Sequence, residues 1–202
     1  MIYEALYDYD DELRTQFGDL VCGTDEAGRG PLAGPVSCAA VILRAGDRFE
    51  WLNDSKKVTE KRREKLCDEI KSRCLFFSFV FIDNRVIDEI NILWASMLGM
   101  SRAVEKLKAA PSLVLADGNR APDCGKIETR CVVHGDAVSA SIAAASIIAK
   151  VERDRFMREL DVRLPQYGFA QHKGYPTKAH YAAIDQFGIT EYHRLSFLKG
   201  RV

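Results

Sequence analysis

Four acidic residues of this sequence follow short apolar runs, at three separate points of the chain: Asp25 with Glu26, Asp117, and Asp136. Clustered carboxylates repel one another and favour protonation unless cations are present. Hard oxygen ligands of this kind suit Mg²⁺ or Mn²⁺. Two such ions, about 3.5–4 Å apart, can hold both the attacking water and the leaving oxygen of a phosphodiester. If the acids converge, they therefore form a metal site suited to cutting nucleic acid.

Each acid taken alone has a plainer explanation, because an Asp at the end of a strand is commonly a turn former or a helix cap. Hydrophobic periodicity does not show whether distant strand ends meet. A shared metal site and separate structural acids both stay open at this point.

The elements that would position these acids can be read from periodicity and composition. Strands are expected at Gln16–Thr24, Val36–Leu43, Leu75–Ile82, Leu113–Ala116 and Ile127–Val133. Helices are expected at Asp54–Arg73, Asp88–Lys108, Ser139–Leu160 and Tyr181–Phe187.

The order of elements is roughly β-β-α-β-α-β-α-β-α. Short connections between the early strands predict antiparallel pairing, and helices between later strands predict parallel pairing. A mixed α/β sheet flanked by helices follows. Open α/β sheets build their sites at the carboxyl ends of strands, which is where the acids stand.

The bulk properties favour one domain spanning residues 1–202 and exclude several classes of protein. The formal net charge is zero, which argues against a protein that coats nucleic acid indiscriminately but permits a local basic groove. No apolar run reaches the length of a membrane span, and the acidic start lacks the features of a signal peptide. Six cysteines without a C-x-x-C pair indicate reduced thiols. We therefore expect a cytoplasmic protein with no membrane contact.

Several segments stand out together, and they are GTDEAGRGPLAGPV (23–36), LNDSKKVTEKRR (52–63), DEINILWASM (88–97), ADGNR (116–120), HGD (134–136), AASIIAKVERD ending at Asp154, PQYGFAQHKGYPT (165–177) and HRLSF (193–197). In this order they resemble the ribonuclease HII family over nearly everything from about residue 20 onward. A lone DEAGRG would be suggestive, whereas the ordered set is highly specific. His134 is a departure, because the family often has Lys at this position, and a neutral imidazole supplies less positive potential.

The resemblance implies an RNase H-like fold with a small helical C-terminal extension, over about residues 160–202. It implies that two Mg²⁺ or Mn²⁺ ions are bound by Asp25, Glu26, Asp117 and Asp136, which are then the catalytic residues. The enzyme would hydrolyse the RNA strand of RNA–DNA hybrids. It would also incise duplex DNA 5′ of embedded ribonucleotides, as in ribonucleotide excision repair, leaving a 3′-hydroxyl and a 5′-phosphate. We expect it to act as a monomer.

Recognition of a ribonucleotide requires contact with its 2′-hydroxyl, which separates RNA from DNA at one position. In the family, the segment Gly28-Arg29-Gly30 contacts the ribonucleotide sugar and backbone, and the tyrosine matching Tyr175 stacks on the sugar of the next nucleotide. Without the resemblance, the glycines would be read as a simple turn and Tyr175 as a half-buried loop aromatic.

Basic residues are expected to contact phosphates, although a solvated helix face explains such a run equally well. The densest basic group is Lys56, Lys57, Lys61, Arg62 and Arg63. The same two explanations apply to Lys150 and Lys173.

Asp154 is a further acid in a family motif, but it stands 18 residues after Asp136 in a segment that is mostly helix. At ~1.5 Å per residue, the two would lie roughly 27 Å apart, too far to share a metal pair. We expect Asp154 to pair with a nearby Arg or to face solvent.

Other functions predict different behaviour. A junction resolvase of the RNase H-like class would cut branched all-DNA substrates and ignore a single ribonucleotide. A catalytically silent module would bind hybrids without metal and give no product. A kinase or phosphatase is disfavoured, because the sequence has no P-loop and no evident nucleophile elbow.

Overall fold

A five-stranded mixed sheet forms the centre of the protein, with the strand order β3-β2-β1-β4-β5. The computed structural model describes residues 1–53, 55 and 58–198. The strands are β1 (Val21–Ala27), β2 (Val36–Ile42), β3 (Phe76–Ile82), β4 (Leu113–Asp117) and β5 (Thr129–Val132). β1 pairs antiparallel with β2, as β2 does with β3, whereas β1 with β4 and β4 with β5 pair in parallel. The predicted mixed α/β sheet is thereby confirmed.

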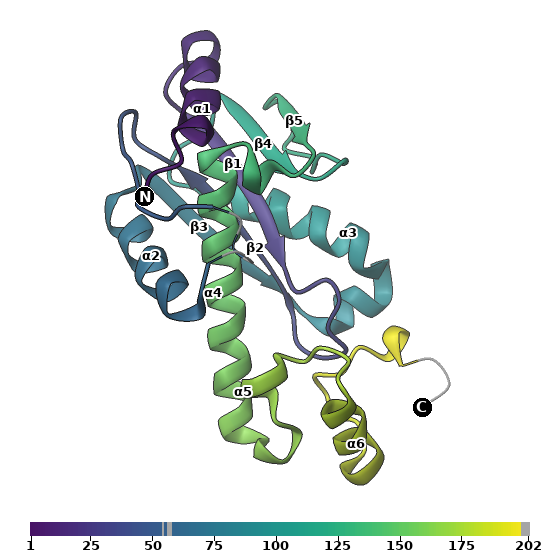
Figure 1. Cartoon of the computed structure of the whole chain (residues 1–202). Coiled ribbons are helices and arrows are strands. Elements are labelled where there is room, and N and C mark those ends of the chain that lie inside the picture. Colours follow the sequence, from purple (N-terminus) through teal and green to yellow (C-terminus); the bar gives the residue numbers. More distant parts are fainter. Residues whose placement is uncertain (54, 56–57, 199–202) are drawn as a thin grey trace.

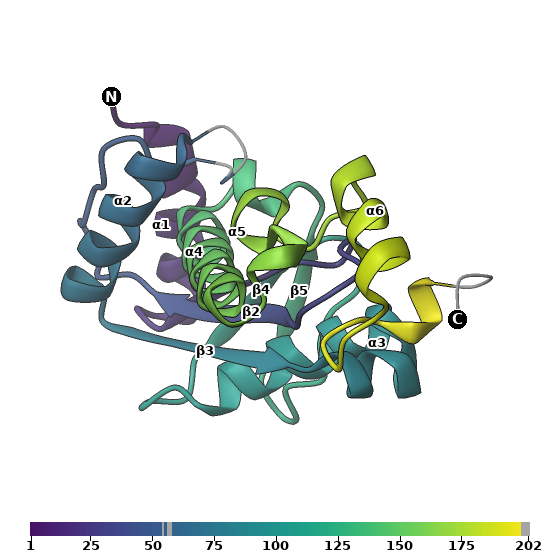
Figure 2. The same cartoon turned by 90° about the horizontal axis from the view of Figure 1, so that it is seen from below.

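Helices cover both faces of this sheet (Figure 2). On one face lie α1 (Glu4–Phe17), α2 (Glu60–Arg73) and α4 (Ala140–Arg163), and on the other lies α3 (Asn84–Glu105). Alternate residues of β2 supply both cores: Ala39 and Val41 pack against α2 and α4, while Cys38 packs against α3. All seven residues of β2 are buried, as expected of a strand that is covered on both sides.

The last part of the chain is helical and packs on the second half of α4 (Figure 1). It contains α5 (Phe169–His172), α6 (Lys178–Phe187) and the short 3₁₀ turns η2 (Pro165–Tyr167) and η3 (Leu195–Phe197). This arrangement confirms the predicted helical C-terminal extension. No helix in the described part of the chain is long and apolar enough to cross a bilayer.

Three expectations about the elements were wrong. Residues 16 and 17 belong to helix α1, so the first strand begins only at Val21. No helix separates β4 from β5, which are joined by a loop and still pair in parallel. The second helix begins at Glu60 rather than at residue 54.

Helix α1 fixes the beginning of the long helix α4. Its buried Asp10 accepts hydrogen bonds from the Ser139 hydroxyl at 2.6 Å, and from the Ser141 amide at 2.8 Å and hydroxyl at 2.6 Å. These bonds satisfy donors at a helix start, where the first amides have no partner within the helix. The acidic first segment therefore serves to anchor α4 beside the sheet.

Candidate active site

Three of the predicted site acids come from neighbouring strands. β1 and β4 are parallel, and Thr24 lies opposite Ala116. The following residues, Asp25 and Asp117, therefore lie side by side. Burial raises the pKa of Asp25 well above its usual range, and the negative charges of Glu26 and Asp117 raise it further.

Asp136 is brought to the same edge by the 3₁₀ turn η1 (Gly135–Ala137), which follows β5. The amide of Gly135 donates a hydrogen bond of 2.6 Å to Oδ1 of Asp117. The turn that carries Asp136 is thus fastened to the end of β4, and Asp136 is itself buried. Charge interactions connect Asp25, Glu26 and Asp117, whereas the convergence of Asp136 with Asp25 and Glu26 stays a prediction.

Protein groups hold two of these carboxylates in place. Asp25 accepts a 2.7 Å hydrogen bond from the Glu26 amide, and the side chain of Ser146 in α4 also bonds to it. Ser146 in turn bonds to the Ser55 hydroxyl at 3.0 Å. Glu26 forms an ion pair of 3.4 Å with Arg29. Burial is the main reason that the pKa of Glu26 is raised, and Asp117 adds to it, whereas Arg29 lowers it.

The donor chemistry of this edge fits hard divalent cations. Buried carboxylates that repel one another take up protons, and a divalent cation relieves the same repulsion. In the described residues, no three His, Cys, Asp or Glu side chains stand ready as a preformed ligand group. The assignment of Asp25, Glu26, Asp117 and Asp136 as metal ligands and catalytic residues therefore stays a prediction.

A pocket of about 220 Å³ opens beside the acids. It is lined by Asp25, Glu26, Ala27, Gly28, Arg29, Gly30, Ser55, Ser146, Lys150 and Tyr175. The structure thus brings the first two acids together with the G-R-G segment, with Tyr175 and with one of the predicted lysines. Lys150 pairs with Asp154 at 2.6 Å, and burial lowers its pKa.

Gly28 is required by the way in which helix α4 packs beneath this pocket. Its φ of +99° lies in the region that favours glycine, and a Cβ at this position would stand 1.9 Å from Nε of Arg153. On the facing wall, the ring of Tyr175 lies 3.5 Å from where a Cβ of Gly30 would be. The pocket is therefore a narrow space between a backbone segment and an aromatic ring.

The remaining predicted residues have other outcomes. Lys173 donates from Nζ to the carbonyl of Ala170 and does not line the pocket. Lys56 and Lys57 lie outside the described residues. The expected partner of Asp154 was an Arg, but its ion pair is with Lys150, one helical turn earlier.

Sequence reasoning missed Ser55 and Ser146. Ser146 lies within a run of small residues where α4 crosses β1, and such a run usually indicates only close packing. Ser55 stands in the DSKK segment, where the lysines drew attention instead. Serine in a helix or loop carries no periodic signal, so only the tertiary contact with Asp25 reveals the role of Ser146.

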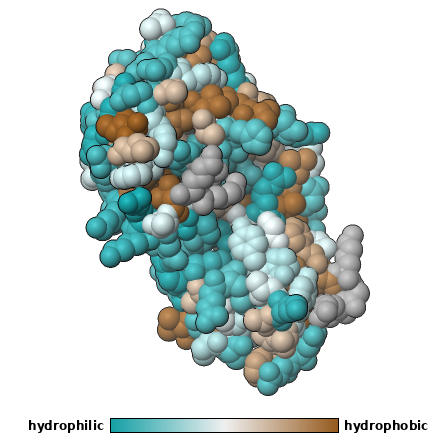
Figure 3. Space-filling view, viewed as in Figure 1, coloured by the Kyte–Doolittle hydropathy of each residue, from teal (hydrophilic) through white to brown (hydrophobic). Residues whose placement is uncertain are grey.

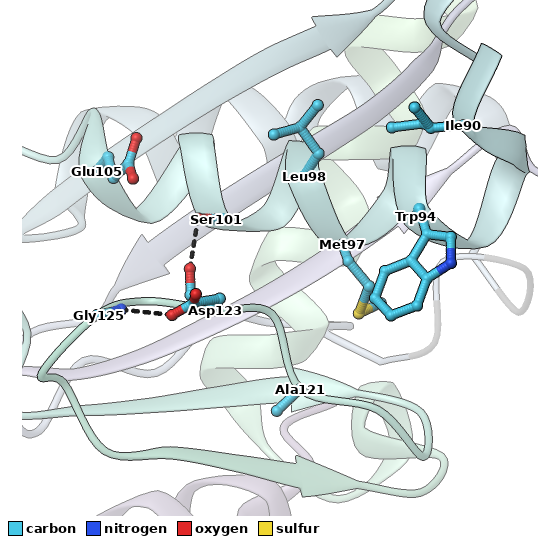
Figure 4. Close-up of a pocket in the computed structure, with 9 residues that line it drawn as sticks. All are labelled: Ile90, Trp94, Met97, Leu98, Ser101, Glu105, Ala121, Asp123 and Gly125. Carbon is cyan, nitrogen blue, oxygen red and sulfur yellow. Dashed lines mark hydrogen bonds between the residues drawn. The ribbon is translucent and has the colours of Figure 1, made fainter.

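A larger hollow, of about 900 Å³, lies elsewhere (Figure 4). It is formed by one side of α3 and the loop between β4 and β5, and its lining is mostly apolar. None of the predicted site acids lines it. The larger of these two pockets is therefore not the one beside the predicted acids.

Comparisons with known proteins agree with this geometry. The family model described as ribonuclease HII matches residues 22–199. The chain is 55% identical to a ribonuclease HII of Shewanella amazonensis over 177 residues, covering 88% of this chain and 85% of the relative. It is 46% identical to a ribonuclease HII of Caldicellulosiruptor bescii over 196 residues, covering 97% and 95%. The crystal structure of ribonuclease H2 from Pyrococcus horikoshii is similar with a TM-score of 0.72 and 25% identity, covering 87% of this chain and 92% of that one.

Proposed function

The chain belongs to the ribonuclease HII family and is a ribonuclease H, and from this premise we propose the details of its reaction. It hydrolyses the RNA strand of RNA–DNA hybrids. It also incises duplex DNA on the 5′ side of an embedded ribonucleotide and leaves a 3′-hydroxyl and a 5′-phosphate. The observation that carries this proposal is one pocket that joins buried acids to the Gly28–Gly30 segment and Tyr175.

The four acids Asp25, Glu26, Asp117 and Asp136 hold two Mg²⁺ or Mn²⁺ ions in this proposal. When bound, the ions would stabilise negative charge on the attacking and leaving oxygens of the phosphodiester. Ser146 orients Asp25 through its hydrogen bond. No nucleophilic side chain is required, and no covalent protein intermediate forms.

The other groups of the pocket contact the sugars of the substrate in this proposal. The backbone of Gly28, Arg29 and Gly30 contacts the ribonucleotide, since glycines allow a close approach. The half-exposed ring of Tyr175 stacks on the sugar of the following nucleotide, where a deoxyribose fits better than a ribose. The pocket is therefore suited to an RNA-to-DNA junction.

Lys150 supplies positive charge beside the scissile phosphate, and its ion pair with Asp154 holds its ammonium group in place. Phosphate contacts by Lys56, Lys57 and Lys173 stay predictions, as do action as a single-domain monomer, a role in ribonucleotide excision repair and a cytoplasmic location. None of these four predictions depends on how the acids are arranged.

The deciding experiment uses a duplex DNA with one ribonucleotide, incubated with Mg²⁺, Mn²⁺ or EDTA. We expect a single cut 5′ of the ribonucleotide with either metal and none with EDTA, with end groups read by product mapping. An all-DNA duplex of the same sequence should stay intact. Cleavage of a branched all-DNA junction without cleavage of the ribonucleotide duplex would indicate a junction resolvase instead and overturn the proposal.

A further inference from the structure

Two arginine side chains, Arg153 and Arg194, lie fully buried beneath the Gly28–Gly30 segment. Arg194 donates from Nη2 to the carbonyl of Gly28 at 2.7 Å and from Nη1 to that of Arg29 at 2.9 Å. Its Nε donates to the carbonyl of Gly34 at 2.9 Å. Every nitrogen of this guanidinium therefore donates a hydrogen bond to a backbone carbonyl of the segment 28–34.

Burying a charged guanidinium without a carboxylate partner is unfavourable for folding, because the charge loses its contact with water. Arg194 forms no ion pair with any carboxylate within the described residues. Burial lowers the pKa of Arg194 to about 9, and the neighbouring charge of Arg153 lowers it as well. A buried charge is often replaced by apolar packing without loss of stability. The three hydrogen bonds of Arg194 therefore indicate that this side chain fixes the conformation of the backbone that it contacts.

The direction of these carbonyls decides which groups face the substrate. In a planar trans peptide, the C=O and the following N–H point in opposite directions, and no peptide bond in the described chain is cis. With the carbonyls of Gly28 and Arg29 turned towards Arg194, the amides of Arg29 and Gly30 point away from it. Neither amide donates a hydrogen bond to another group in the described residues. Successive amides on one side form a concavity that binds oxygen acceptors.

We propose that Arg194 is a positioning residue for ribonucleotide recognition, because it turns two backbone amides towards the 2′-oxygen of the substrate. This inference rests on the proposed function and specifies how the sugar is read. Arg29 and Gly30 line the same pocket as Asp25 and Glu26, so an oxygen held by their amides lies next to the acids. Arginine is needed, because its planar fork reaches several carbonyls that a lysine ammonium cannot span together.

The segment that carries Arg194 is itself fixed to helix α3. Asp88 accepts hydrogen bonds from the amide of Leu195 at 2.8 Å and from the amide of Ser196 at 2.9 Å. The backbone of Arg194 also donates to the carbonyl of Leu32 at 2.8 Å. Asp88 lines no part of the pocket, so its substitution loosens Arg194 without touching the substrate.

The test compares the full chain with its Arg194→Lys variant on a duplex with one ribonucleotide, using the all-DNA duplex of the same sequence as a competitive inhibitor. We expect KM for the ribonucleotide duplex to rise about tenfold, the size of one lost charge-assisted hydrogen bond. The inhibition constant of the all-DNA duplex should stay unchanged, because its phosphate contacts are the same. The ratio of inhibition constant to KM then falls about tenfold.

Two further variants keep this test decisive. Ile70→Ala removes a buried side chain of α2 that does not line the pocket, and it serves as a control for lost stability. It should lower kcat because less of the enzyme is folded, and it should leave the ratio unchanged. If Arg194→Lys does not fold, Asp88→Asn takes its place, with a smaller fall in the ratio.

The outcomes separate the two proposals. An unchanged ratio in the folded variant, or equal weakening of both duplexes, overturns the role of Arg194 while the proposed function stands. A wild-type chain that does not cut the ribonucleotide duplex overturns both.

Discussion

At the scale of single residues, the site combines groups that repel one another with groups that hold them. Asp25 shows this clearly, because Glu26 and Asp117 raise its pKa whereas Ser146 bonds to it. A protein tolerates such a cluster where it serves a ligand, since buried like charges oppose folding.

Replacing Asp25 with Asn should abolish cleavage, a loss of at least roughly 10²–10⁴-fold. Asn has nearly the same shape and removes a charge that opposes folding, so thermal unfolding should occur at or above the wild-type temperature. Initial rates on the single-ribonucleotide duplex and a melting curve measure both effects. Asp68→Asn, which removes only a surface ion pair of 3.1 Å with Arg155, is the matched control. Cleavage by the Asp25 variant at the wild-type rate would remove the proposed role.

Gly28 offers a second test at this scale. Gly28→Ala should destabilise the protein by clearly more than the about 1–2 kcal/mol of left-handed backbone strain, because its Cβ would also displace Arg153. Gly46→Ala is a matched control with a φ of +81° and open space around it, so it should show the strain alone. Urea unfolding compares the two, and equal losses of stability would contradict the packing argument.

At the scale of elements, much of the fold could be predicted. The strands β2 and β3 and the helices α3 and α4 follow from their apolar periodicity, and the strand-end pattern of acids led to the edge where Asp25 and Asp117 lie side by side. Helix α1 was missed because its acidic surface obscured a buried stripe of Leu6, Asp10 and Leu13. The parallel pairing of β4 with β5 could not be inferred either, because no helix lies between them.

The roles of the buried arginines could not be predicted from sequence. Arg153 and Arg194 stand in segments that resemble known motifs, but an Arg in a sequence is by default a surface residue. Their burial depends on carbonyls of two distant parts of the chain, residues 28–35 and Lys173, which meet at one point. Only tertiary structure supplies that information.

The C-terminal helices depend on neutral histidines. Nδ1 of His193 accepts from the Thr190 amide at 2.8 Å, so its proton is on Nε2 and is donated to Nε2 of His180 at 3.2 Å. The Nδ1 proton of His180 is then donated to the carbonyl of Tyr175 at 3.0 Å. This chain of bonds connects α6 to the backbone of Tyr175, for which we propose stacking on a sugar.

Lowering the pH should reduce the free energy of unfolding, because His193 is buried in its neutral form. Burial is the main reason that the pKa of His193 is lowered from 6.5 to about 4. The unfolded chain then binds a proton that the folded chain refuses, so stability is full above pH 6.5 and falls as the pH drops towards 4. Between pH 7 and pH 5 the wild type should lose up to about 2 kcal/mol more than His193→Gln. Urea unfolding at both pH values measures this, and equal losses would contradict it.

At the scale of the whole molecule, charge is balanced rather than concentrated. Lys and Arg together number 29, as do Asp and Glu, and the face in Figure 3 is largely hydrophilic with separate hydrophobic patches. Because its net charge is zero, the molecule must bind an anionic nucleic acid through local groups of side chains and backbone. The pocket beside the acids is one such place.

Metal should stabilise the whole fold. A ligand at 100 times its Kd contributes about 2.7 kcal/mol, and here it would also relieve repulsion between buried carboxylates. Adding Mg²⁺ or Mn²⁺ to metal-free protein should therefore raise Tm by several degrees, an effect that Asp25→Asn should largely lose. Differential scanning calorimetry with and without EDTA measures the shift, with Ca²⁺-free NaCl at equal ionic strength as control. No shift in the wild type would argue against a metal site at these acids.

Helix α4 runs alongside β1 for the length of the site, with Ser141 against Gly23 near its start and Arg153 against Gly28 further on. One continuous helix therefore contacts both the strand that carries Asp25 and the Gly28–Gly30 segment, for which we propose contact with the sugar. Asp25 and Glu26 stand in β1, and Gly28 follows this strand directly, so the number of backbone bonds between the acids and this segment is fixed. In the proposed reaction, the broken bond therefore keeps a constant offset from the ribonucleotide, whatever bases surround it.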